Sequence, residues 1–252
     1  AFRVNAMVED SDSFRDGVSV EREGINPTVA IRAGKNTSVV LGYEHFQDER
    51  VADRGIPSQN GRPFATDEST FFGSAQQSPT WSRVNAFTAV IDHDFGNGVS
   101  LRNRTRAADY DKFYQNVFAS RAVEPAGTVA LGAYNNATQR SNLFNQTDLS
   151  YTLDAGGIKH KLLVGAEFGR QETDNLRQTG YNAEGTTALS VSAANPTYTA
   201  PVLFRPSPTD ANNHGVAKVA SVYLQDQLEF SPQWQAVLGL RYDRFNVAFL
   251  NN

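Results

Sequence analysis

Apolar and polar residues alternate along about nine stretches of the chain. In stretch 235–247, for example, Ala236, Leu238, Leu240 and Tyr242 lie on one face and Gln235, Arg241 and Asp243 on the other. The nine stretches are 2–9, 27–32, 37–46, 81–94, 99–112, 143–153, 160–171, 216–230 and 235–247. Because successive side chains of a β-strand point to opposite faces, this pattern predicts strands that each have one apolar and one polar face.

Two features leave the assignment of faces open. Stretch 81–94 offers two candidate apolar faces, which are Val84, Ala86 and Val90, or Phe87, Ala89 and Ile91. Asp226 falls on the apolar face of its strand, which is compatible with a position near a membrane interface or with a bulge that flips the register. Other polar residues that interrupt apolar faces are Asn103, Asn145 and Thr147.

The connections between the stretches are very short or very long. Candidate tight turns lie at 33–37, 95–98, 154–157 and 231–234. The long polar connections are 48–80, 114–137 and 175–213. Short turns on one side and long loops on the other are typical of outer-membrane barrels, whereas loops of this length are uncommon in compact soluble domains. The pattern therefore predicts an antiparallel transmembrane β-barrel with periplasmic turns and extracellular loops.

Composition limits the alternatives. Apolar residues make up 40% and charged residues 20%, which a soluble protein would also show. No stretch approaches the roughly 18 to 20 consecutive apolar residues of a spanning helix, but a barrel strand needs apolar residues only at alternate positions. The net charge of −4 argues against a nucleic-acid partner. The chain starts inside an alternating run without a signal peptide, so we expect residues 1–252 to be part of a longer protein.

Candidate catalytic residues are few. Cysteine is absent, which excludes a thiol nucleophile and a thiolate metal site. Asp92, His93 and Asp94 are adjacent on a predicted strand, so their side chains point to alternate faces and cannot converge. No His-Glu-x-x-His, Gly-x-Ser-x-Gly or phosphate-loop motif occurs. We therefore expect no enzyme activity, no metal site and no cofactor of the protein's own.

Four segments resemble a known family. Residues 223–230 and 238–245, joined by a Ser-Pro turn, resemble a hairpin of TonB-dependent siderophore receptors. Residues 53–63 (Asp-Arg-Gly-Ile-Pro-Ser-Gln-Asn-Gly-Arg-Pro) are similar to an external-loop motif of the ferric-catecholate and ferrichrome-type receptors. Residues 1–15 and 157–168 are similar to barrel strands of the same family. The four segments occur in the order expected for the family.

The resemblance implies a fold and a function. Such receptors have an N-terminal plug inside a barrel of roughly 22 strands, so residues 1–252 would form part of the barrel, with the plug and the C-terminal strands outside this chain. The implied protein lies in the outer membrane of a Gram-negative bacterium and imports a ferric siderophore of catecholate or hydroxamate type. Energy would come from the TonB complex, which would contact the plug. A general or substrate-specific porin and a surface β-sheet adhesin are the alternatives. A porin would have no plug upstream of this chain, and an adhesin would lack one-sided loops and a lipid-facing belt.

Candidate ligand-binding residues combine arginine with aromatic side chains. The predicted external loop 48–80 and its foot contribute Arg54, Arg62, Phe64, Phe72 and Trp81, and Tyr114 is added from the next strand. Arginines and aromatic rings suit a planar, anionic, aromatic chelate. The alternative is that the Gly-Ile-Pro and Asn-Gly-Arg-Pro segments only shape the loop. For Tyr110, Phe113, Tyr114 and Phe118 together, a membrane girdle or barrel rim is favoured over a ligand cage.

A second set of residues is predicted to line the lumen. These are the arginines on the polar faces of two strands, Arg102, Arg104, Arg106 and Arg241. They could steer an anionic chelate, or they could form a solvated wall and pair with plug carboxylates. Connection 175–213, which is rich in small residues, is predicted to become ordered on contact and holds no single decisive residue. The identity of the siderophore, and whether iron is the cargo, stay open.

Overall fold

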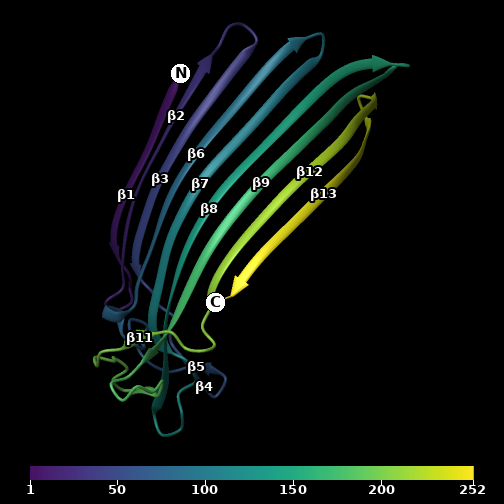
Figure 1. The fold of residues 1–252 in the computed structure, drawn as a ribbon. Coiled ribbons are helices and arrows are strands. Elements are labelled where there is room, and N and C mark those ends of the chain that lie inside the picture. Colours follow the sequence, from purple (N-terminus) through teal and green to yellow (C-terminus); the bar gives the residue numbers. More distant parts are fainter. Residues whose placement is uncertain (252) are drawn as a thin grey trace.

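The computed structural model describes residues 1–251, and its main element is one curved antiparallel sheet (Figure 1). The long strands are β1 (Phe2–Asp12), β2 (Ser19–Arg32), β3 (Thr37–Val51), β6 (Pro79–Gly96), β7 (Val99–Ala119), β8 (Thr128–Ala155), β9 (Ile158–Tyr181), β12 (Asn212–Ser231) and β13 (Trp234–Asn251). They lie side by side in sequence order, with β1 and β13 at the edges. All nine predicted stretches lie within these strands, so the prediction of a barrel-type antiparallel sheet is confirmed.

The turns and loops are segregated to opposite ends of the sheet. Figure 1 shows the short turns at the top and the loops, with β4 (Ser58–Gln59), β5 (Arg62–Pro63) and β11 (Leu203–Arg205), at the bottom. Two hairpins turn through residues with positive φ, Asn97 and Gly98 (51° and 81°) and Gly156 and Gly157 (60° and 80°). Two such residues in succession match the twist of paired strands, which explains the Asn-Gly and Gly-Gly sequences.

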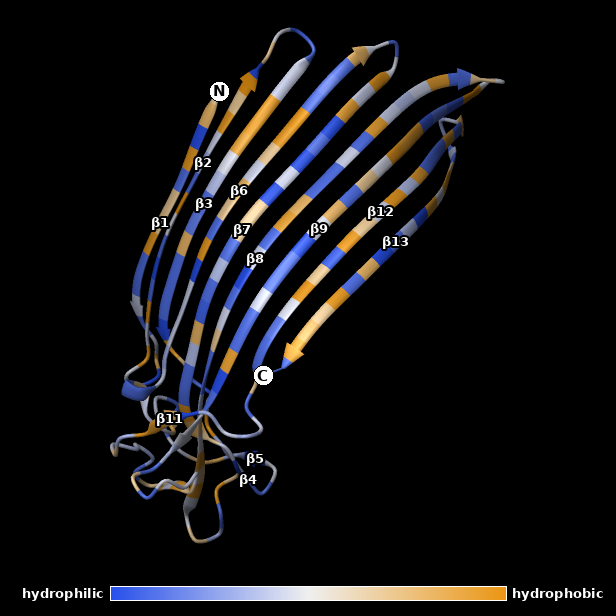
Figure 2. Ribbon diagram, in the orientation of Figure 1, coloured by the Kyte–Doolittle hydropathy of each residue, from blue (hydrophilic) through white to orange (hydrophobic). Residues whose placement is uncertain are grey.

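Cross-strand pairing aligns the apolar residues on one face. Val164 of β9 pairs with Leu224 of β12, which pairs with Leu240 of β13. We call this face the apolar belt; it includes Val39, Leu41, Tyr43, Phe87, Ala89, Ile91, Leu101, Ala107, Leu143, Leu149, Val164, Phe168, Ala220, Val222, Leu224, Leu238 and Leu240. Figure 2 shows the resulting alternation of hydrophobic and hydrophilic positions along the strands.

The register resolves the ambiguous stretch of β6. Phe87 pairs with Tyr43, and Ile91 pairs with Val39, so the set Phe87, Ala89 and Ile91 lies in the belt. The competing residue Val90 pairs with Val40 and with Arg104, on the polar face. Sequence alone could not choose, because both sets are apolar; the partners on β3 and β7 decide.

The polar residues on the apolar face bind one another. Asp226 stays on this face, because the pairing of β12 with β13 shifts only between Glu229 and Ser231; the alternative of a register-flipping bulge at Asp226 was wrong. Its Oδ2 lies 2.8 Å from Nδ1 of His160, a residue of the same face. The other interruptions form a closed network, in which Asn103 Nδ2 donates to Thr147 (2.7 Å) and Asn145 Nδ2 donates to Thr105 (2.7 Å).

Two of the predicted loops are shorter than expected. Most of 114–137 is strand, since β7 runs to Ala119 and β8 begins at Thr128. The long connection after β9 also contains short strands, because β10 (Leu189–Ser192) pairs with β8 and β11 pairs with β9. Backbone pairing continues beyond the belt, where Asn, Gln, Thr and Tyr replace the aliphatic residues. The period-two signal therefore fades before the strands end.

The loops form one packed layer at their end of the sheet. Its buried apolar residues are Phe72, Val117, Val123, Val129, Leu131, Leu189, Ala193 and Val202. Backbone hydrogen bonds join separate loops, including Val123 N to Ser58 O (2.8 Å) and Tyr198 N to Gly73 O (2.7 Å). Gln77, in the short helix η1 (Ala75–Gln77), donates to Ala200 O at 3.0 Å and accepts from Val202 N at 2.9 Å. Among residues 1–251, no helix is long and apolar enough to cross a membrane.

Candidate functional site

Arg54 lies at the centre of an aromatic cluster at the loop end of the sheet. Its Nε donates a hydrogen bond to the hydroxyl of Tyr114 (2.8 Å), and its terminal nitrogen donates to the hydroxyl of Tyr134. Its guanidinium carbon lies 4.6 Å from the ring centre of Phe118 and between 5 and 6 Å from the two tyrosine rings, at 5.7 and 5.8 Å. Arg54 is nevertheless exposed, so the cation is accessible.

The strands of the sheet position these aromatic rings. Tyr114 and Phe118 lie four residues apart on β7 and therefore share a face. Tyr134 lies on the neighbouring β8, and its ring centre is 5.8 Å from that of Tyr114 and 5.9 Å from that of Phe118. We call Arg54, Tyr114, Phe118 and Tyr134 the rim cluster.

The positive charge of the rim cluster is not balanced by a carboxylate. Asp53, the neighbour of Arg54 in sequence, instead pairs with Arg15 at 3.0 Å. Within the part of the chain that the structure describes, Arg54 makes no ion pair. Burial lowers the pKa of Arg54, but the hydrogen bonds with Tyr114 and Tyr134 outweigh that effect and raise the pKa above its usual value. The guanidinium is therefore charged and, because Arg54 is exposed, accessible at the loop end of the sheet.

A second arginine extends the cluster. Arg177 of β9 stacks on the other tyrosine of the cluster, with its guanidinium carbon 3.9 Å from the ring centre of Tyr134. Unlike Arg54, it is partly neutralised, because its Nε lies 3.3 Å from the buried carboxylate of Asp210. The loop end thus holds two guanidinium groups that both lie within 6 Å of the ring centre of Tyr134.

The other predicted loop residues lie in different surroundings. Phe72 is 3% exposed and packs edge to face on Phe64, with ring centres 6.2 Å apart. Both rings belong to the packed core of the loop layer, where they support the loop from within. Arg62 is exposed on β5. A direct contact of any of these residues with ligand stays a prediction, and burial makes Phe72 the least accessible.

Trp81 points away from the rim cluster. It stacks on Phe113, with ring centres 6.1 Å apart and planes inclined by 24°. Trp81 and Phe113 pair with each other on the face that carries the apolar belt. The next pair along these strands, Thr80 and Tyr114, lies on the opposite face. The aromatic set at the loop end of β7 is therefore divided: Phe113 lies on the outer face, whereas Tyr114 and Phe118 belong to the rim cluster.

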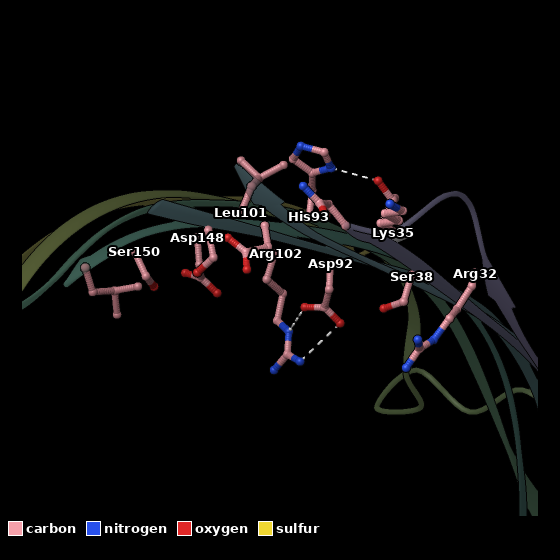
Figure 3. Close-up of a pocket in the computed structure, with 14 residues that line it drawn as sticks. Arg32, Lys35, Ser38, Asp92, His93, Leu101, Arg102, Asp148 and Ser150 are labelled. Carbon is pink, nitrogen blue, oxygen red and sulfur yellow. Dashed lines mark hydrogen bonds and ion pairs between the residues drawn. The ribbon is translucent and has the colours of Figure 1, made fainter. Parts of the chain in front are cut away.

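The predicted lumenal arginines all lie on the polar face. Figure 3 shows Arg102 and Asp92 on the inner side of the curved sheet, with Leu101 and His93 on the outer side. Arg102 binds both carboxylate oxygens of Asp92, at 2.6 and 3.2 Å. Farther along the same strand, Arg106 lies 3.7 Å from Glu44. The row of cations on β7 is thus partly neutralised by carboxylates of β6 and β3.

Arg241 belongs to a larger polar network on the same face. It pairs with Glu167 at 3.0 Å and with Asp243 at 2.9 Å. Next to it, Tyr223 donates a hydrogen bond to Asp148 and accepts one from Gln146 at 2.9 Å. A lumenal role for these residues and for Arg104 stays a prediction. No group of three or more His, Asp or Glu side chains in residues 1–251 is arranged to hold a metal ion.

Sequence reasoning missed Tyr134 and Phe118 of the rim cluster and the neighbouring Arg177. Tyr134 and Arg177 lie in regions that were predicted to be loops, and Phe118 was assigned to a girdle or rim. Their only signal is the register, which places Tyr134 opposite Asn116 and next to Tyr114. Arg177 pairs with Asn136, two residues along β8 from Tyr134. Neither pairing is visible in the sequence of one strand.

The fold and the polarity of its faces define a class of protein. An antiparallel sheet with an apolar outer face, a charged inner face and ordered loops at one end is the wall of an outer-membrane β-barrel. Residues 26–252 match the family model described as TonB dependent receptor-like, beta-barrel. The chain therefore belongs to the β-barrel family of TonB-dependent receptors, which reside in the outer membrane of Gram-negative bacteria.

Individual relatives agree with this assignment. The chain is 29% identical, over its full length, to the metal-pseudopaline receptor CntO of Pseudomonas aeruginosa, of which it covers 36%. It is 26% identical to the catecholate siderophore receptor Fiu of Escherichia coli, with 99% of this chain and 35% of Fiu aligned. The crystal structure of the siderophore receptor PiuA from Acinetobacter baumannii superimposes with a TM-score of 0.86 at 23% identity, over 99% of this chain and 39% of PiuA. The chain thus spans little more than a third of the length of these relatives.

Proposed function

We propose that the receptor containing this chain binds a ferric siderophore at its extracellular face and imports it with energy from the TonB system. In this proposal residues 1–252 are part of the barrel wall, and the plug that would contact TonB lies outside them. The observation that carries the proposal is the exposed, uncompensated guanidinium of Arg54 among three aromatic rings.

The chemistry of the rim cluster suits an iron chelate of catecholate or hydroxamate type. Catecholate complexes of iron carry negative charge on oxygen atoms, to which a guanidinium donates charge-assisted hydrogen bonds. Their rings are planar and can stack on Tyr114, Phe118 or Tyr134. Because Arg54 has no carboxylate partner in residues 1–251, an incoming anion does not have to displace one. A porin would have no need for this arrangement above the membrane.

A metal chelate of another kind is the second candidate. The relative at 29% identity is named as a metal-pseudopaline receptor, and the relatives at 26% identity include catecholate siderophore receptors. A guanidinium with aromatic rings recognises any planar or carboxylate-rich anionic chelate. The rim cluster therefore supports a flat, anionic cargo and does not distinguish between metals.

Binding measurements on the full-length receptor test the proposal. Arg54→Ala combined with Arg62→Ala should weaken binding of a ferric catecholate at least about tenfold, because each charge-assisted hydrogen bond contributes about 1.5–3 kcal/mol and 1.4 kcal/mol corresponds to tenfold. Arg54→Lys should have an intermediate effect, since an ammonium group keeps the charge but lacks the guanidinium fork that spans two tyrosines.

The control is Arg121→Ala, which removes an exposed arginine of the loop between β7 and β8. Its affinity should equal that of the unsubstituted receptor. Barrel folding is checked by the heat-dependent mobility of each variant on gels. Unchanged affinity in the Arg54 and Arg62 double variant would refute a ligand-binding role, and the Asn-Gly-Arg-Pro segment would then act only as a turn former.

A further inference from the structure

The connection between β1 and β2 contains a buried arginine. Residues 13–18 form this connection, and Arg15 within it is 8% exposed. Its Nε lies 3.0 Å from Oδ2 of Asp53. Its Nη1 donates hydrogen bonds to the backbone carbonyls of Glu68 and Thr70, the latter at 3.2 Å. A guanidinium that is removed from water needs such partners, because an unpaired buried charge is costly.

All three partners of Arg15 belong to the loop between β3 and β6. Asp53 lies near the start of this loop, and the two carbonyl groups lie in its second half, so one guanidinium joins both parts to a neighbouring connection. A backbone hydrogen bond supports the contact, since Asp16 N donates to Ser69 O at 2.8 Å. We call the three contacts of Arg15 the loop latch.

Asp53 connects the loop latch to Arg54. One of its carboxylate oxygens binds Arg15, and the other accepts a hydrogen bond from Gly55 N at 2.8 Å. This hydrogen bond closes a turn around Arg54, and Gly55 has the positive φ (76°) at the end of that turn. A single carboxylate therefore holds the backbone on both sides of Arg54.

The segment around Arg54 has few other anchors. On either side of it, Ala52 N and Pro57 O make backbone hydrogen bonds of 2.8 and 2.9 Å. Between these two points, in the part of the chain that the structure describes, the hydrogen bonds to other segments come from the side chains of Asp53 and Arg54. The place of the Arg54 guanidinium over the aromatic rings thus depends on Asp53, which in turn is held by Arg15.

We propose that Arg15 is a positioning residue for the anionic chelate, because it holds Arg54 over the rings of the rim cluster by way of Asp53. The inference rests on the proposed function of the rim cluster and adds a residue that lies outside it. Without the loop latch the turn around Arg54 would have to be ordered during binding, and this ordering lowers affinity. Arg15 also occupies the carboxylate of Asp53, which otherwise would neutralise the neighbouring Arg54 and compete with the incoming anion.

A double-mutant cycle in the full-length receptor tests the inference, with the iron(III) complex of 2,3-dihydroxybenzoate as the probe. Arg15→Met removes the charge but fills the same space, and it should weaken binding about tenfold, a coupling of the size that residues in one network show. In the Arg54→Ala receptor the same substitution should weaken binding by less than about twofold, because the side chain that Arg15 positions is already absent. A residue that only stabilised the loop would cause the same loss in both receptors.

Two further variants keep the test specific. Arg22 of β2 pairs with the carboxylate of Asp48, which is 2% exposed, at 2.5 Å. Arg22→Met therefore breaks a comparable ion pair on the strands, and it should leave the affinity for the probe unchanged. Asp53→Asn keeps the hydrogen bond that closes the turn but removes the charge that Arg15 binds, so it should weaken binding by a smaller factor than Arg15→Met. If Arg15→Met fails to fold by heat-dependent gel mobility, Asp53→Asn takes its place in the cycle.

Hydrogen exchange of the receptor without ligand gives a second readout. The amide of Gly55 should exchange at least about tenfold faster in the Arg15→Met receptor, because the carboxylate that accepts its hydrogen bond is no longer held. Arg22→Met should leave the exchange of this amide unchanged. This comparison does not depend on the identity of the cargo.

Three outcomes would overturn the inference. The first is unchanged affinity in the Arg15→Met receptor when Arg54→Ala weakens binding, which would refute the inference and leave the proposed function intact. The second is an equal loss with and without Arg54→Ala, which would make Arg15 a general support of the loop. The third is unchanged exchange of the Gly55 amide. Unchanged affinity in the Arg54→Ala receptor itself would refute the proposed function, and the inference with it.

Discussion

Gly73 lies where the loop between β3 and β6 packs against the backbone of β7. Its φ is 131°, a region that residues with a side chain rarely adopt. A Cβ placed there would lie 1.8 Å from the carbonyl oxygen of Val117 and 2.7 Å from its carbon. Since both atoms belong to the backbone of β7, they cannot move aside as a flexible side chain would. Gly73→Ala therefore requires the loop to move away from the strand.

The size of the effect follows from the contacts that the movement breaks. Three backbone hydrogen bonds anchor this point: Gly73 N to Pro196 O (3.1 Å), Tyr198 N to Gly73 O (2.7 Å) and Ser74 N to Val117 O (3.1 Å). At about 1 kcal/mol each they contribute about 3 kcal/mol, and the strained φ adds about 1–3 kcal/mol if it persists. We expect Gly73→Ala to reduce the local stability of the loop layer by about 3–6 kcal/mol.

Hydrogen exchange in the full-length receptor measures this change. Amides of 52–78 and 182–211 should exchange at least about a hundredfold faster, because 3 kcal/mol exceeds two factors of ten, while amides of the belt strands keep their protection. Gly61→Ala is the control, since Gly61 also has a positive φ (76°) but a Cβ there would meet nothing within 4 Å. Equal protection of both loops in the Gly73→Ala receptor would show that the loops are not held together at this contact.

Three further predictions concern the barrel wall. Gly165→Ala places a Cβ 2.2 Å from the ring of Tyr223. The substitution should displace this ring from Asp148 and Gln146 and lower the midpoint of denaturant unfolding of the receptor. An unchanged midpoint would contradict this prediction. His160→Leu should destabilise the folded barrel in lipid by about 1–3 kcal/mol, because it leaves the carboxylate of Asp226 without its partner on the apolar face. Adding Asp226→Leu should restore the loss, and additive losses in unfolding titrations would argue against the pair. Spin labels on the belt face should report lipid, at Val164, Phe168, Leu238 and Leu240. Spin labels on the opposite face should report water or plug, at Arg104, Gln225 and Arg241. Water accessibility at the belt positions would show that the two faces are assigned the wrong way round.

Much of the fold could be predicted from sequence, because the outer face of a barrel imposes a local rule. Lipid requires an apolar residue at every second position, so each strand carries its own signal, and the Asn-Gly and Gly-Gly pairs mark hairpins independently. Alternation along single strands thus indicated nine strands, the short turns and most of the faces. Four segments in the expected order indicated the family, which the match over 26–252 confirms.

The remaining features depend on which residues lie opposite one another across strands, and no single strand contains that information. The faces of β6 were decided by Tyr43 and Arg104, and the partner of Asp226 by the position of His160 on β9. Beyond the belt, neither lipid nor plug demands alternation, so the ends of β7 and β8 were not predicted. Sequence predicted Arg54 as a candidate ligand-binding residue. Only the tertiary structure placed Tyr134 and Phe118 beside it, because the loop and the strands meet there through contacts between residues 60 to 80 positions apart.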